Sequence, residues 1–241
     1  MKIPWNICGV SPALWRRCRV AYVGLAFLSA QGAAQQPAGW APAWWTQRGV
    51  LEPNAQADDY AVANSGQLKN IATQAYQELL AHLPGGAGDM TPGATGYLLT
   101  QVVIGWQSPT QATDDFSVIN LGQLKAVAQP FYQRLVEVGY CNALPWNGTA
   151  DNYAVANLGQ LKNLFNFDLT YPGPDGGPPA WWQNYYFGTT GIDFNALAPS
   201  GDGMTIMQKF LSGASPYLYV ANPPQLGSSL VGLQVSGFVT P

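Results

Sequence analysis

The chain has 241 residues, of which 47% are hydrophobic, 12% aromatic and only 10% charged, and its formal net charge is −3. This aromatic content is too high for a disordered chain, and the 27 Gly and 19 Pro residues stay below the range of low-complexity sequence. The acidic balance excludes a protein that seeks nucleic acid or anionic lipid by charge attraction. The length suits one domain of moderate size or two small ones.

Residues 1–34 have the pattern of a secretory signal peptide. Three arginines precede an apolar run over 20–30, and Gly32 and Ala34 supply small residues for a cleavage site. The run is about half of the roughly 20 residues that a membrane-spanning helix needs, so we expect export without a membrane span. Without this segment, six Lys and Arg face thirteen Asp and Glu, a formal charge of −7. Cys141 is then the only cysteine, which excludes an intramolecular disulfide.

A hexapeptide of the form N-x-G-Q-L-K occurs three times in the sequence. Its asparagines lie 56 and then 37 residues apart, a spacing too uneven for a regular solenoid. The sequence therefore predicts a mainly α fold of irregular helical repeats with long loops, in which each unit is one helix with variable connectors. The repeated residues are Asn64, Gly66, Gln67, Lys69, Asn120, Gly122, Gln123, Lys125, Asn157, Gly159, Gln160 and Lys162.

The residues after each hexapeptide carry apolar side chains at helical spacing, as in Leu68, Ile71, Ala72, Ala75 and Leu79. In the second copy a proline at position 130 interrupts the stripe, and we expect a kink or a restart near residue 128. The asparagine suits a helix N-cap, and the glycine permits a close backbone approach. The acids ten or eleven residues upstream of each lysine (Asp58, Asp59; Asp114, Asp115; Asp151) suit the start of a helix.

The three lysines allow two interpretations. In one, Gln and Lys form a ligand-binding pair that is presented three times. In the other, each lysine is tied to the upstream acid of its own unit or to helix carbonyls, while Gln bonds a loop. The second is favoured, because every unit carries its own acid and no unit carries a nucleophile.

Two Trp-Trp pairs follow a Pro-Ala dipeptide, at Trp44-Trp45 and Trp181-Trp182. Adjacent side chains on a helix point about 100° apart, so only one of each pair need face a core. An exposed indole would stack on a sugar or anchor a partner. The alternative, which is slightly favoured, is that both tryptophans hold a helix against its neighbour.

Residues 193–211 suggest a degenerate calcium loop, with Asp193, Asn195 and Asp202 before a short apolar helix. The match is poor, since Lys209 stands where a calcium loop has its bidentate glutamate. Calcium is the one cofactor that the sequence suggests.

The run "PAWWTQRGVL…ADDYAVANSGQLKNIATQAY" resembles the N-terminal regions of large exported bacterial surface proteins, some of them RHS/YD-repeat proteins. The run "PPAWWQNYYFGTTGIDFNALAPSGDGMTIMQKFLSG" is similar to bacterial calcium-binding segments of the thrombospondin type 3 or dockerin-like kind. The resemblance implies a secreted or cell-surface presentation region, followed by longer domains. No enzymatic activity is carried over from this resemblance.

These observations divide the chain into a signal peptide (1–34), a helical repeat domain (40–170), a Pro/Gly linker (171–178), a Trp-Trp and calcium-loop segment (179–215) and a β-prone tail (216–241). The pattern of the tail predicts the first strand of a further domain. We expect an exported, non-enzymatic scaffold or interaction module. Its partners would be other domains of a larger surface protein or an extracellular polymer. The alternatives are a carbohydrate- or cell-wall-binding module that uses exposed tryptophan pairs, or a calcium-stabilised adhesion module.

Catalysis is not expected. His82 is the only histidine, and neither it nor Cys141 lies in a recognisable catalytic motif. The paired acids, such as Asp58 and Asp59, are adjacent on the chain and do not face each other as glycosidase carboxylates must.

Overall fold

The computed structural model describes residues 41–50, 58–105, 114–148 and 151–221. Over these ranges the protein is mainly helical, as predicted, with seven helices and a few isolated β-bridges. The helices are α2 (Ala43–Gln47), α3 (Ser65–His82), α4 (Thr95–Gly105), α5 (Leu121–Glu137), α6 (Leu158–Leu164), α7 (Ala180–Phe187) and α8 (Ile206–Leu211). The predicted signal peptide and most of the β-prone tail lie outside the described residues.

Helices α3, α5 and α6 each begin directly after the asparagine of one hexapeptide. In α3, Asn64 Oδ1 accepts a hydrogen bond from Gln67 N at 2.9 Å, and Gln67 Oε1 accepts one from Asn64 N at 3.0 Å. The same two bonds recur between Asn120 and Gln123 and between Asn157 and Gln160. Each copy therefore forms a complete capping box. The asparagine N-cap is confirmed, and the glutamine completes the same cap instead of bonding a loop.

Helix α5 continues through Pro130, so of the two predicted outcomes, a kink or a restart near residue 128, the restart is wrong. A proline inside a helix removes one backbone hydrogen bond and costs about 3 kcal/mol. Here the burial of its neighbours offsets that cost, since Ala128, Phe131 and Leu135 are completely buried.

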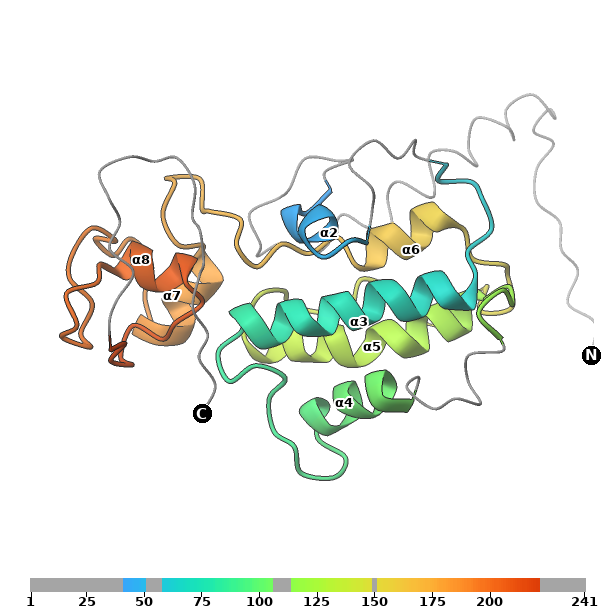
Figure 1. Ribbon diagram of the computed structural model, residues 1–241, viewed down its shortest axis with the longest axis horizontal. Helices are drawn as coiled ribbons and strands as arrows, with labels where there is room; N and C mark the ends of the chain where they lie inside the picture. Colours follow the sequence, from blue (N-terminus) through green and yellow to red (C-terminus); the bar gives the residue numbers. More distant parts are fainter. Residues whose placement is uncertain (1–40, 51–57, 106–113, 149–150, 222–241) are drawn as a thin grey trace, which may run out of the picture.

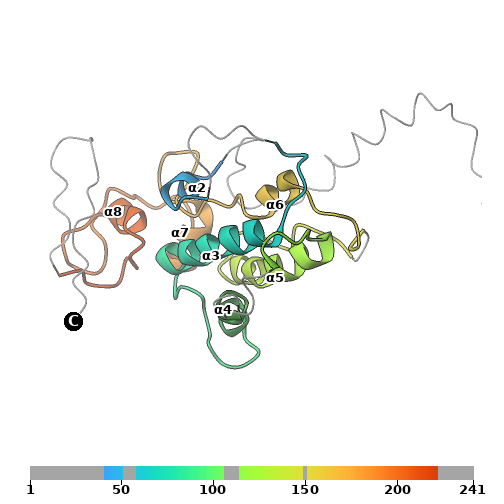
Figure 2. The ribbon, with the colours of Figure 1, turned by 45° about the vertical axis from the view of Figure 1, so that its right-hand side comes forward.

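The three hexapeptide helices start at one end of the molecule and run in the same general direction (Figure 1). Helices α3 and α5 lie side by side, and α4 packs beneath them, an arrangement that Figure 2 also shows. Helices α7 and α8 lie at the opposite end, beyond the C-terminal end of α3.

Helix α4 was not predicted. It is anchored by Gly96, where an added Cβ would lie 2.6 Å from the backbone oxygen of Asp89. Only a residue without a side chain permits this approach.

A single apolar cluster connects the repeat helices to the C-terminal segment. Phe131 of α5 meets Phe165 edge-on at 5.4 Å between ring centroids, and Tyr140 meets Trp181 of α7 at 5.9 Å. The predicted linker 171–178 includes a hydrogen-bonded turn, in which Gly173 N donates to Gly177 O at 2.8 Å. Every helix of the described ranges is too short or too polar to cross a bilayer.

Candidate interaction site

The extended segments that precede α3, α5 and α6 join in a closed cycle of backbone hydrogen bonds. Ala63 N donates to Ala156 O at 3.0 Å, Ala156 N donates to Ile119 O at 3.0 Å, and Ile119 N donates to Ala63 O at 3.2 Å. All three side chains are buried. Three antiparallel bridges accompany the cycle. We call residues 58–66, 114–122 and 151–159 the ring.

A second set of bonds joins each helix to the next unit around the ring. Gly159 N donates to Asp59 O at 2.9 Å, and the equivalent bonds join Gly66 to Asp115 and Gly122 to Asn152, each at 2.8 Å. A Cβ at Gly159 would lie 3.0 Å from Asp59 Cβ and 3.1 Å from its backbone oxygen. The glycines therefore serve the close approach that the sequence predicted, and they have no left-handed backbone angle.

Each repeated lysine donates a hydrogen bond to the acid or amide of the neighbouring unit. Lys69 Nζ donates to Asp115 Oδ1 at 2.6 Å, Lys125 Nζ to Asn152 Oδ1 at 2.9 Å, and Lys162 Nζ to Asp59 Oδ1 at 2.7 Å. The order runs from the first unit to the second, the second to the third, and the third back to the first. The prediction of a pairing within each unit is wrong, while the structural role of the lysines agrees with the favoured interpretation.

The upstream acids also act on the neighbouring unit. Asp115 lies beside the first turn of α3, and Asp59 lies beside the first turn of α6, as their bonds to Gly66 and Gly159 show. Negative charge there offsets the positive ends of helices that start close together. The first turns of α3, α5 and α6 contain no acid of their own.

Every unit of the ring exposes an aromatic residue and a valine. Side chains alternate along an extended segment, so residues two before Asn64 and its equivalents point away from the buried ring centre. The aromatic residues are 92%, 92% and 96% exposed, and the valines 53–56%. They are Tyr60, Val62, Phe116, Val118, Tyr153 and Val155. We call these six residues the ring face, and the ring lies at the end of the molecule away from α7 and α8 (Figure 1).

Sequence reasoning missed the ring face. A signal was present, because Asp-[Asp/Asn]-[Tyr/Phe]-x-Val recurs in all three copies. Its acids suit the start of a helix, which leaves the exposed aromatic residue without a local explanation.

The tryptophan pairs do not form an exposed binding surface, contrary to the first interpretation. Trp44, Trp45, Trp181 and Trp182 are at most 3% exposed. The indoles of the first pair donate to backbone oxygens of the segment after α6, Trp44 Nε1 to Phe167 O at 2.7 Å and Trp45 Nε1 to Phe165 O at 3.0 Å. Both indoles therefore lie in the core, while Ala43, Thr46 and Gln47 of the short helix α2 are exposed.

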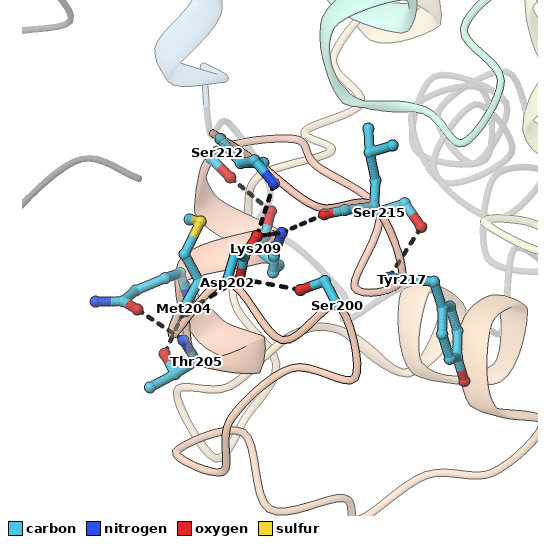
Figure 3. A network of polar contacts seen from close by, with 11 residues as sticks. Ser200, Asp202, Met204, Thr205, Lys209, Ser212, Ser215 and Tyr217 are labelled. Carbon is cyan, nitrogen blue, oxygen red and sulfur yellow. Dashed lines mark hydrogen bonds and ion pairs between the residues drawn. The ribbon is translucent and has the colours of Figure 1, made fainter. Parts of the chain in front are cut away.

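The predicted calcium segment contains a buried ion pair (Figure 3). Lys209 Nζ donates to Asp202 Oδ2 and to Leu218 O, and the side chains of Asp202 and Lys209 are fully buried. The other donors to Asp202 are Ser200 Oγ at 3.0 Å, Met204 N at 3.1 Å and Val220 N at 2.9 Å. Burial alone would raise the pKa of the Asp202 carboxyl, but these donors together hold it well below its usual range.

The ammonium group of Lys209 thus occupies the carboxylate of Asp202, which the predicted calcium site would need as a ligand. The two other predicted ligands lie elsewhere on the same loop, where Asp193 Oδ1 accepts a hydrogen bond from Asn195 N at 3.0 Å. Across the described ranges, no three His, Cys, Asp or Glu side chains gather where they could hold a metal.

The two residues that could serve as catalytic groups, His82 and Cys141, lie in structural surroundings. Glu78 of α3 is buried and pairs with Arg48 at 2.9 Å, and His82 Nε2 lies 3.5 Å from its other oxygen. Cys141 is buried, and burial raises the pKa of its thiol to about 11. A thiol with this pKa is a poor nucleophile at neutral pH.

No protein-family model, curated protein or solved structure matches the chain.

Proposed function

We propose that this chain is an exported, non-enzymatic interaction module, folded as an irregular helical repeat, and that the ring face is its binding surface. The observation that carries the proposal is the recurrence of three almost fully exposed aromatic residues, Tyr60, Phe116 and Tyr153, at equivalent positions of a closed ring.

Packing does not explain this recurrence. A buried position that recurs in each unit, such as Ala63, is constrained by the core around it. Other exposed positions of the repeat vary in chemical type, as the residue after each lysine does: Asn70, Ala126 and Asn163. Exposed aromatic residues carry a solubility cost, and aromatic side chains dominate the energetics of binding surfaces.

The proposal that the chain is not an enzyme is supported by the interactions of the candidate catalytic groups. His82 pairs with buried Glu78, the Cys141 thiol has a raised pKa, and Asp59 is bonded to Lys162. Export is supported by the signal-peptide pattern of residues 1–34. A secreted or cell-surface location within a larger protein follows from that pattern and from the resemblance to bacterial surface proteins.

Binding to isolated cell envelopes of the producing organism tests this proposal. Wild-type protein is compared with a triple variant, Tyr60→Ser, Phe116→Ser and Tyr153→Ser. The removed rings make little contact within the chain, so the melting temperature should stay unchanged. We expect envelope binding to fall at least tenfold in the triple variant. Equal binding by both proteins would refute the assignment of the ring face.

A further inference from the structure

We infer that the ring face binds a neutral glycan, with one sugar unit stacked on each of Tyr60, Phe116 and Tyr153. This inference rests on the proposed function and names the class of its ligand.

The first argument is the presentation of the aromatic rings. Each is more than nine-tenths exposed, so its flat face is open to a ligand. A pyranose presents a flat face of C–H groups and carries its hydroxyls around the edge. It therefore loses apolar surface to water on an aromatic ring while its polar groups stay hydrated.

The second argument is the polar pair whose acid or amide directly precedes each aromatic residue in the sequence. Tyr60 directly follows Asp59, which is bonded to Lys162 of the neighbouring unit. The same arrangement places Asp115 with Lys69 before Phe116, and Asn152 with Lys125 before Tyr153. A hydroxyl both donates and accepts hydrogen bonds, so one hydroxyl can donate to the carboxylate or amide oxygen and accept from the ammonium group. Sugars supply such hydroxyls next to an apolar face.

The third argument is charge. The two Lys–Asp pairs cancel, and Lys125 bonds the neutral Asn152, so its positive charge offsets one of the remaining acids. These acids, Asp58, Asp114 and Asp151, are exposed, and with Lys125 they leave a formal charge of −2. These three carboxylates repel an anionic polymer and also repel the same face of a second copy. A protein partner would have to take the Lys–Asp pairs out of water, which is costly for ions. Hydroxyls of a neutral sugar replace that water instead.

The threefold repetition suits a ligand made of identical units. A single sugar on one aromatic ring binds weakly. Three equivalent subsites on one rigid ring gain affinity from multivalency when the ligand is a polymer or a densely presented glycan.

The test is depletion of the full-length mature protein from solution by three purified insoluble neutral polysaccharides, cellulose, chitin and β-1,3-glucan. We expect at least one of them to bind the wild type. Each single Ser substitution should weaken that binding about threefold, and the triple variant at least tenfold. Tyr60→Phe should bind like the wild type, because phenylalanine occupies the equivalent position 116.

Tyr219→Ser is the matched control, since Tyr219 is an exposed tyrosine (64%) outside the ring. It should leave binding unchanged. Depletion that is equal for the wild type and the triple variant would overturn the inference, as would the absence of binding to all three polysaccharides.

Envelope binding separates the inference from the proposed function. If the triple variant loses envelope binding, and periodate oxidation of the envelope glycans also abolishes binding of the wild type, the glycan inference and the proposed function both stand. If periodate leaves binding intact and protease treatment abolishes it, the ring face binds a protein, and the glycan inference is wrong while the proposed function stands.

Discussion

Lys162 of the third hexapeptide donates a hydrogen bond to Asp59 of the first at 2.7 Å, although 103 positions separate the two residues. This contact and the bond from Gly159 N to Asp59 O close the ring. Because the third unit returns to the first, the units form a closed assembly and not an open stack that would expose a free end.

Closure predicts that the three central amides behave as one unit in hydrogen exchange. Ala63, Ile119 and Ala156 each depend on the other two for a bond, so opening any junction should expose all of them. Lys162→Ala should lower the protection of all three by a common factor of about two to five, the worth of a partly exposed ion pair. Loss of protection at Ala63 and Ala156 with Ile119 unchanged would show that the junctions open independently.

Gly159→Ala should lower the free energy of unfolding by about 1–2 kcal/mol, because the new methyl group would crowd the backbone of Asp59. The matched control is Gly105→Ala at the end of α4, where the new Cβ meets nothing within 4 Å. That change should be neutral or stabilise by about 0.5 kcal/mol through helix propensity. Urea denaturation measures both, and a stabilising Gly159→Ala would contradict the close approach.

Trp44→Phe should cost about 1–2 kcal/mol more than Trp181→Phe. Both remove part of a buried indole, but only Trp44 donates a hydrogen bond, to Phe167 O. Its loss leaves a buried carbonyl without its donor. Trp181 Nε1 is buried and has no partner among the described residues, so its removal sacrifices no bond. Equal unfolding free energies for the two variants would refute this difference.

The Asp202 carboxylate should make stability depend on acid pH. Its folded-state pKa is depressed, while an unfolded aspartate titrates near 3.9. The unfolded state therefore binds more protons in acid, so the stabilisation is complete above about pH 5 and is lost as pH falls below it. The double variant Asp202→Asn with Lys209→Met removes the pair without leaving one charge buried. Its free energy of unfolding should fall less steeply between pH 5 and 2, and parallel curves for both proteins would contradict the expectation.

Local features of the fold were predictable from the sequence, and long-range ones were not. The apolar spacing after Asn64, Asn120 and Asn157 predicted the helices and their caps, because capping and amphipathic burial depend on residues within a few positions. Helix α4 was missed, since its anchoring contact at Gly96 depends on the loop at Asp89.

The candidate site was missed because it depends on closure. Bonds from the lysines span 46, 27 and 103 residues, and no local pattern says whether a lysine meets its own unit or the next. For a related reason, the sequence left the tryptophan pairs open between exposed binding and packing against a neighbour, with packing slightly favoured. Helical geometry places adjacent side chains in different directions, but only the tertiary packing shows that both directions lead into the core.

The central claim is that neighbouring units close a ring through their lysines, and double-mutant cycles on Lys162 test it most directly. One cycle pairs Lys162→Ala with Asp59→Ala of the first unit, and the other pairs it with Asp151→Ala of its own unit. Closure predicts a coupling energy of about 0.5–1 kcal/mol with Asp59 and none with Asp151. Coupling to Asp151 and not to Asp59 would contradict the ring.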